Sequence, residues 1–128
     1  MIVLDASAVI AWLRREPGAE QVDAAFGDEP VMGAMNFAEV LSKVGERGGD
    51  VRSAARDLRI EGLRVEPYGD EDAVVTGELR VLTRAQGLSL GDRACLALAQ
   101  RLGVPVLTAD RQWADLDINV TVQVIRSP

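Results

Sequence analysis

Four carboxylates stand at positions where a predicted strand ends or a predicted helix begins. Asp5 directly follows one apolar strand, and Asp110 follows another with one residue between. Glu39 and Asp92 each fall in the first turn of a predicted helix. In an open α/β sheet, strands end and helices begin along one edge, and ligands bind there. The four carboxylates are therefore predicted to gather on one edge of the sheet.

Gathering carboxylates is costly unless something neutralises them. Two unit charges about 4 Å apart repel by about 4 kcal/mol at an effective dielectric of about 20. Protons or a hard cation must therefore share such a site. Oxygen ligands without histidine or thiolate select Mg²⁺ or Mn²⁺ over zinc or copper. A cation held in this way can activate water and stabilise charge on a phosphate, so the pattern indicates metal-dependent phosphodiester hydrolysis.

The composition excludes several other chemistries. The chain has no histidine, which excludes imidazole acid–base catalysis and histidine-ligated zinc. Its one lysine, Lys43, does not follow a glycine, so a Walker phosphate-binding loop is missing. Its one cysteine, Cys95, forms no internal disulfide, and no apolar run is long enough to span a membrane. These features predict a cytoplasmic protein in a reducing compartment.

The charge is unusual for a nucleic-acid-binding protein. A net charge of −6 is not the expected signature of such a protein, unless several acids surround a cation. All the basic residues except Lys43 are arginine, which suits bidentate contacts to phosphate. Five arginines are candidate RNA contacts; the alternative is that they are solvated or lie at a helix C-terminus. They are Arg14 and Arg15, at the end of the first helix, and Arg52, Arg56 and Arg59, on one helix face.

Alternating strands and helices predict one α/β domain over residues 1–128, with a mostly parallel sheet and helices on both faces. Strands are predicted at 2–4, 31–32, 63–66, 104–108 and 120–125. Helices are predicted at 8–15, 19–26, 36–47, 51–61, 70–86 and 90–102, and a short helical turn follows Asp110. Asn36 is interpreted as the N-cap of its helix.

Each acid also has a purely structural interpretation. Ser89 and Asp92 match a capping box, in which Asp92 only accepts backbone N–H groups. Asp5 and Asp110 suit simple N-caps, and Glu39 suits the positive end of a helix dipole. The shared edge favours a common site, but spacing alone leaves both interpretations open.

Four segments of the chain resemble PIN-domain nucleases, and within those they are most similar to VapC toxins of bacterial toxin–antitoxin modules. Each motif is weak alone, whereas four in the same order are specific. The segments are Ile2-Val-Leu-Asp-Ala-Ser-Ala-Val-Ile10, Asn36-Phe-Ala-Glu-Val40, Leu90-Gly-Asp-Arg-Ala-Cys-Leu-Ala-Leu-Ala99 and Val106-Leu-Thr-Ala-Asp-Arg111.

The resemblance implies a PIN-domain-like three-layer sandwich with a Mg²⁺ or Mn²⁺ site. The ligands it implies are Asp5, Glu39, Asp92 and Asp110, with the hydroxyls of Ser7 and Thr108 beside them. It also implies an endoribonuclease that cuts tRNA, rRNA or mRNA. The implied partners are a second copy, forming a homodimer, and a VapB-type antitoxin whose arginine enters the acidic site.

Two other functions fit parts of the pattern. The first is a catalytically idle PIN-fold module that binds another protein. The second is a phosphohydrolase in which Asp5 becomes phosphorylated. That chemistry usually needs a second acid two residues later, where this chain has Ser7, and a positioned lysine, whereas Lys43 lies within a predicted helix.

Overall fold

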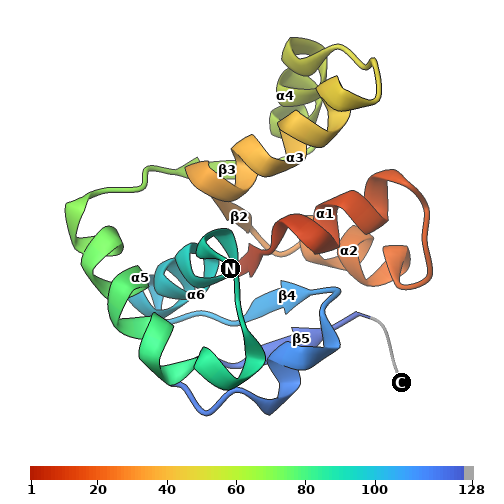
Figure 1. Ribbon diagram of the computed structural model, residues 1–128. Helices are drawn as coiled ribbons and strands as arrows, with labels where there is room; N and C mark the ends of the chain where they lie inside the picture. The colour runs from red at the N-terminus through yellow and green to blue at the C-terminus, as the bar shows by residue number, and fades with distance from the viewer. Residues whose placement is uncertain (126–128) are drawn as a thin grey trace.

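Five short strands form a fully parallel sheet in the computed structural model, which describes residues 1–125. The strand order is β3-β2-β1-β4-β5, so β1 lies at the centre (Figure 1). Parallel neighbours need crossover connections, and the helices supply them. The predicted parallel α/β fold is confirmed. The strands are β1 (Ile2–Leu4), β2 (Pro30–Gly33), β3 (Arg64–Glu66), β4 (Val106–Thr108) and β5 (Val122–Val124).

Helices cover both faces of the sheet. One layer contains α1 (Ala6–Leu13), α2 (Ala19–Phe26), α3 (Ala34–Glu46) and α4 (Val51–Ile60). The other contains α5 (Asp70–Leu82) and α6 (Leu90–Leu102). Figure 1 shows α3 and α4 extending away from the sheet as a helical hairpin. Within residues 1–125, no helix combines the length and apolar character that a membrane crossing requires.

Alternation along the strands divides the core into two clusters. Leu4 of β1 and Leu107 of β4 face the layer of α1 to α4. Val3 and Val106, one position earlier in each strand, face α5 and α6. Because successive strand side chains point to opposite faces, a strand buried on both sides is apolar throughout. Strand β1 is buried throughout, and Asp5 is the residue that directly follows it at the edge of the sheet.

Several predicted boundaries differ from the structure by a few residues. The first helix begins at Ala6 instead of residue 8. Helix α3 begins at Ala34, with Gly33 as its N-cap, so the interpretation of Asn36 as an N-cap is wrong. The predicted helix over 70–86 stops at Leu82, and a 3-10 turn, η1 (Arg84–Gln86), follows it. The Thr83 hydroxyl donates to the Leu79 carbonyl at 2.8 Å at this end of the helix.

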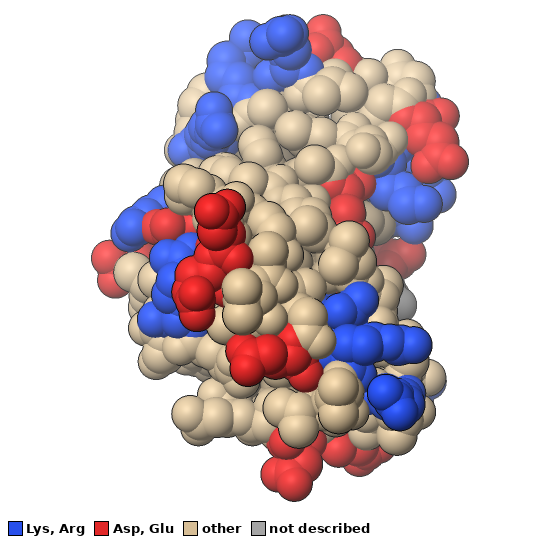
Figure 2. All heavy atoms as spheres, turned by 60° about the vertical axis from the view of Figure 1, so that its left-hand side comes forward, with Lys and Arg blue, Asp and Glu red and all other residues tan. Residues whose placement is uncertain are grey.

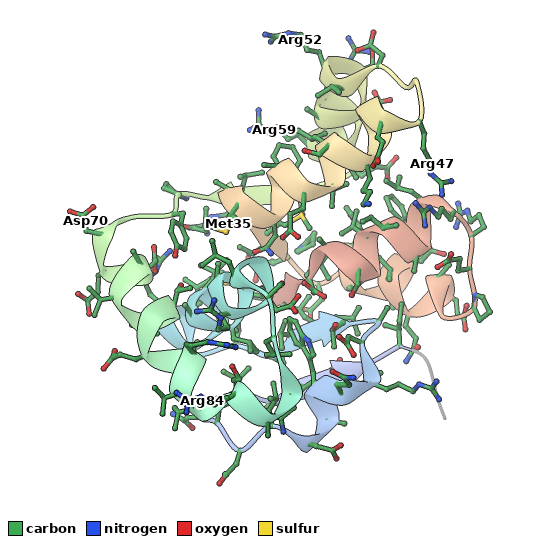
Figure 3. The ribbon with its side chains drawn as sticks, viewed as in Figure 1. Met35, Arg47, Arg52, Arg59, Asp70 and Arg84 are labelled. Carbon is green, nitrogen blue, oxygen red and sulfur yellow. The ribbon has the colours of Figure 1, made fainter. Side chains whose placement is uncertain are left out.

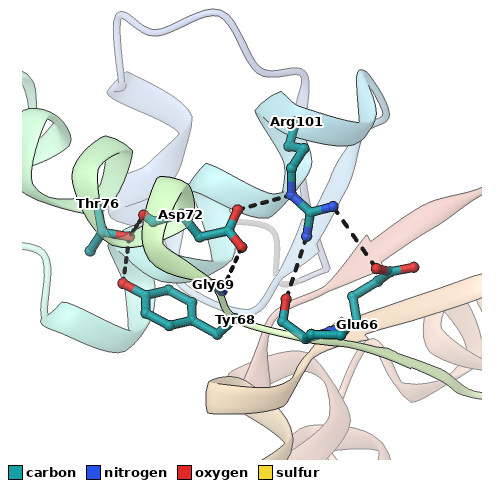
Figure 4. A network of polar contacts seen from close by, with 7 residues as sticks. Glu66, Tyr68, Gly69, Asp72, Thr76 and Arg101 are labelled. Carbon is teal, nitrogen blue, oxygen red and sulfur yellow. Dashed lines mark hydrogen bonds and ion pairs between the residues drawn. The ribbon is translucent and has the colours of Figure 1, made fainter.

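A polar network joins α5 and α6 to the end of β3 (Figure 4). Arg101 of α6 donates through Nε to Asp72 at 2.9 Å and also approaches Glu66 at 3.9 Å. The other Asp72 oxygen accepts the Gly69 backbone N–H at 3.0 Å, which caps α5. One largely buried carboxylate thus satisfies both a helix terminus and a cation.

Replacing Asp72 tests how much this network stabilises the fold. Asp72→Ala is expected to lower the free energy of unfolding by about 1–3 kcal/mol, because it removes a cap and strands the Arg101 guanidinium. Urea denaturation followed by circular dichroism measures the change. Asp70→Ala, an exposed acid in the same helical turn, is the matched control and should cost less than about 1 kcal/mol. Equal losses in the two variants would contradict the role assigned to the network.

Candidate active site

Asp5 is the buried acid around which the candidate site is built. It follows β1 directly and is 3% exposed. Its Oδ2 atom accepts hydrogen bonds from the hydroxyl of Ser7 at 2.6 Å and from that of Thr108 at 2.9 Å. Thr108 ends β4, the strand paired with β1, so the sheet itself brings donor and acceptor together across about a hundred positions of sequence.

The two hydroxyls are themselves held by the backbone. The Ser7 Oγ atom accepts the Ala109 N–H at 3.0 Å, and Thr108 Oγ1 accepts the Asp110 N–H at 3.1 Å. The hydroxyl oxygens of Ser7 and Thr108 lie 3.2 Å apart. Because each hydroxyl oxygen already accepts a backbone N–H, its own O–H is free to donate to Asp5. The N–H groups of Ala109 and Asp110 thus orient the two hydroxyls, and the hydroxyls in turn orient the Asp5 carboxylate.

Glu39 is positioned by Asn36, a residue whose role the sequence analysis missed. Asn36 is 1% exposed, and its Nδ2 donates to Glu39 Oε1 at 2.8 Å and to the carbonyl of Gly91 at 2.9 Å. One amide therefore orients the acid and ties α3 to the start of α6. The signal in the sequence was an amide three positions before an acid, which is one helical turn.

The first turn of α6 lies directly against the Glu39 carboxylate. A Cβ atom added at Gly91 would collide with the carboxylate oxygens of Glu39. A side chain at residue 91 would therefore displace the flexible end of Glu39, so glycine here preserves the position of the Glu39 carboxylate; the φ angle of Gly91 is not in the positive range. The positive end of the α6 dipole consequently faces the Glu39 acid.

Asp92 and Asp110 both act as caps, as their structural interpretation expected. Ser89 and Asp92 form a capping box, with Asp92 Oδ2 accepting the Ser89 N–H at 3.0 Å. Asp110 caps the 3-10 helix η2 (Arg111–Asp115), its Oδ1 accepting the Gln112 N–H at 3.0 Å. Capping holds each side chain in one orientation, so the structural role does not exclude a functional one.

All four acids share one pattern of hydrogen bonding. Among the bonds made within residues 1–125, each acid receives its protein donors on a single carboxylate oxygen. The second oxygen has no protein donor. Oxygen-rich donor sets of this kind are what Mg²⁺ and Mn²⁺ prefer, so the donor chemistry fits such an ion. The bonded oxygens are Oδ2 of Asp5, Oε1 of Glu39, Oδ2 of Asp92 and Oδ1 of Asp110.

The acids raise one another's proton affinity. Burial raises the pKa of Asp5 from 3.8 to about 6, and the charges of Asp92 and Glu39 add to the rise, whereas the Ser7 and Thr108 hydroxyls oppose it. Burial and the Asp92 charge also raise the pKa of Glu39, against the hydrogen bond from Asn36. These shifts are the ones expected of carboxylates crowded together without a counter-ion.

Buried Cys95 lies within electrostatic range of three of the acids. Burial raises the pKa of its thiol well above the ordinary value, and the charges of Asp5, Asp92 and Glu39 raise it further. The backbone N–H of Asp110 donates to Thr108, but its carboxylate caps η2, and its charge is not among those that raise the pKa of Asp5, Glu39 or Cys95. Within residues 1–125, no three acidic or thiol groups are already arranged as a metal-binding cluster.

The five candidate arginines lie in two places. Arg14 is the C-cap of α1, and Arg15 pairs with Asp23 at 3.6 Å, both exposed. The arginines of α4 line a shallow depression of about 450 Å³ whose lining includes none of the four acids. Figure 2 shows basic side chains gathered at the end of the molecule where α4 lies. The α4 arginines are Arg52, Arg56 and Arg59.

A parallel α/β sheet with carboxylates at the ends of its central strands and at the starts of its helices defines a known class of protein. The sequence profile of the PIN domain matches residues 2–119. The chain belongs to the PIN domain family.

Solved structures share this fold over nearly the whole chain. A toxin–antitoxin complex from Klebsiella pneumoniae has a TM-score of 0.78 at 16% identity, covering 100% of both chains. VapC20 of Mycobacterium tuberculosis, a toxin that cleaves the sarcin–ricin loop, has a TM-score of 0.72 at 20% identity, covering 94% of this chain and 99% of that one. VapBC2 from Rickettsia felis, bound to promoter DNA, has a TM-score of 0.74 at 14% identity, covering 97% and 98%. No curated protein matches the chain in sequence.

The raised pKa of Asp5 makes stability depend on pH. Between pH 3.8 and about 6 the folded protein binds more protons at Asp5 than the unfolded chain does. Stability is therefore expected to fall as pH rises through this window. Asp5→Asn keeps an acceptor oxygen for both hydroxyls and removes the charge.

Without added metal, Asp5→Asn should exceed the parent in free energy of unfolding by about 2–3 kcal/mol at about pH 7.5, and the difference should vanish near about pH 4. Urea denaturation in EDTA at the two pH values measures both quantities. A parent whose stability rises through this window, or a variant no more stable at neutral pH, would show that Asp5 is not a desolvated acid.

Proposed function

We propose that this PIN-domain protein is a Mg²⁺- or Mn²⁺-dependent endoribonuclease and the toxin of a cytoplasmic toxin–antitoxin pair. The observation that carries the proposal is a buried carboxylate, Asp5, oriented by two hydroxyls and electrostatically coupled to Glu39 and Asp92. Such strongly perturbed groups gathered at the ligand-binding edge of an α/β sheet are typical of functional sites.

The residues proposed to hold the ion are Asp5, Glu39, Asp92 and Asp110. When bound, a divalent cation lowers the pKa of water and offsets charge on a phosphate. The protein's own groups set the geometry: Ser7 and Thr108 hold Asp5, Asn36 holds Glu39, and backbone N–H groups hold Asp92 and Asp110. Each group thereby presents its second oxygen without a large reorganisation, and preorganisation of this kind is a main source of catalytic power.

The related structures support the substrate and partner classes. VapC20 is described as cleaving an RNA loop, and the other two are complexes of toxin with antitoxin. We accordingly propose RNA as the substrate, a homodimer as the assembly and a VapB-type antitoxin as the inhibitor. An antitoxin arginine entering the acidic site would meet carboxylates whose pKa values are raised by burial and, to a smaller extent, by one another's charge, which favours a charge-assisted contact.

The geometry disfavours the phosphohydrolase alternative. Two residues after Asp5, where that chemistry needs an acid, this chain has Ser7, whose hydroxyl donates a hydrogen bond to Asp5. Lys43 is exposed and pairs with Glu46 at 3.6 Å on the surface of α3. An idle binding module differs from a nuclease only in activity, so cleavage assays separate those two.

Metal-dependent cleavage is the decisive measurement. The pure protein, incubated with structured RNA and Mg²⁺ or Mn²⁺, should cleave it, and EDTA should abolish the reaction. Asp5→Asn and Asp92→Asn should each reduce kcat by about 100-fold or more, because each removes a charge proposed to hold the cation. Asp117→Asn, an exposed acid outside the site, is the matched control and should retain full activity. Equal cleavage by Asp5→Asn would identify a contaminating nuclease and refute the proposal.

Replacing Gly91 separates an effect on stability from an effect on activity. Gly91→Ala places a methyl group against the flexible end of Glu39, so the acid must move while the helix gains propensity. We expect unfolding free energy unchanged or raised by up to about 1 kcal/mol, with kcat reduced about 10-fold or more. Gly77→Ala, in α5 with open space around it, should gain the same stability at unchanged activity. Undiminished activity of Gly91→Ala would remove Glu39 from the mechanism.

A further inference from the structure

A groove runs between α1 and α3 and opens at the candidate active site. Its larger part, of about 660 Å³, is lined by Ser7 and Asp110 of that site. Its smaller part, of about 240 Å³, continues between the two helices. The two parts share Ile10, Arg14 and Lys43, so they form one continuous depression, here named the α1–α3 groove.

Four cations line the α1–α3 groove although the chain as a whole is acidic. Lys43 follows Glu39 by four positions in α3, and Arg47 follows Lys43 by four more. Each step advances about 6 Å along the helix on nearly the same face. Figure 3 shows Arg47 extending from the end of α3 toward the end of α1. The other two cations are Arg14, opposite on α1, and Arg111, next to Asp110.

The acids near the groove do not cancel this positive character. Glu16 and Asp110 line its larger part, and the cations Arg14, Lys43 and Arg111 outnumber them there. Glu46 pairs with Lys43 at 3.6 Å, but the two side chains are 55% and 69% exposed, and exposed pairs of this kind contribute little and break readily. Between the cations the walls are apolar, from Ile10, Val40 and Val44. Cations separated by apolar surface suit a chain of phosphates joined by sugars and bases.

We propose that the α1–α3 groove binds the RNA backbone on one side of the cleaved phosphate, with Lys43 and Arg111 contacting the phosphates next to the site and Arg14 and Arg47 those beyond. The inference rests on the proposed ribonuclease function. It assigns a positioning role to the single lysine, which the sequence analysis left without one. Cleavage then requires single-stranded RNA that can follow the groove away from the carboxylates.

The arginines of α4 are the competing surface. Figure 3 shows Arg52 and Arg59 pointing to the side of the α3–α4 hairpin opposite to Arg47. Their depression shares no lining residue with the active site, whereas the α1–α3 groove shares Ser7 and Asp110. An RNA strand that places a phosphate at the carboxylates reaches Lys43 and Arg111 first.

Binding to an inactive protein tests the groove directly. In the Asp5→Asn background, fluorescence anisotropy measures the Kd for a short labelled single-stranded RNA at several salt concentrations. Lys43→Gln and Arg111→Gln should each raise Kd about 3-fold, and together about 10-fold, with the salt slope reduced by about 0.7 per lost contact. Arg84→Gln, far from the groove in Figure 3, is the matched control and should change Kd less than about 2-fold.

Kinetics in the otherwise unaltered protein separate this inference from the proposed function. With Mg²⁺, the groove variants should raise KM for RNA while kcat stays within about 2-fold of the parent, and Lys43→Arg should restore KM. Thermal midpoints equal to the parent's exclude misfolding.

If the parent cleaves RNA but the groove variants keep its KM and Kd, the groove serves another ligand, such as a protein segment, and the inference is wrong. A larger loss in Arg52→Gln and Arg59→Gln would place RNA on α4 instead. A parent that cleaves no RNA overturns the proposed function itself.

Discussion

Burial of a carboxylate at the end of the central strand is the constraint on which the rest of the site depends. Water cannot solvate Asp5, so the protein must supply donors, and it does so with Ser7 and Thr108. Those hydroxyls satisfy one oxygen but do not offset the charge, and the pKa therefore remains raised. The Asp5 charge is therefore left uncompensated by the protein, and in the proposed function a hard cation or an antitoxin guanidinium would neutralise it.

In the proposed site, capping and the positioning of ion ligands would be the same interaction. The bonds that close the N-termini of α6 and η2 also determine where Asp92 and Asp110 direct their remaining oxygens. A carboxylate that already acts as a cap has lost its rotational freedom in the folded protein. Binding a cation would then cost it less conformational entropy than it would cost a freely rotating carboxylate. Asn36 extends this arrangement to Glu39, which lies too far into α3 to be held as a cap.

Local patterns predicted the sheet and the helices, and they placed Asp5 and Asp92 on one edge because strand ends and helix starts share one edge of a parallel sheet. Glu39 was predicted in the first turn of its helix but lies in the second, because α3 begins at Ala34. Local patterns did not predict the role of Asn36, since its contact with Gly91 joins positions 55 apart and no local rule reports it. The steric demand at Gly91 was equally invisible, as it arises from the approach of two helices. Single-residue preferences thus fail where a contact joins residues that are far apart in the sequence.

The strand order has a consequence for synthesis of the chain. The central strand β1 is made before every other strand of the sheet, whereas its neighbour β4, which contributes Thr108, is made only after β2 and β3. A growing chain that has not reached residue 110 therefore lacks both the Thr108 hydroxyl that orients Asp5 and the Asp110 carboxylate. Under the proposed function, activity would then arise only after the strand β4 has been made and has paired with β1.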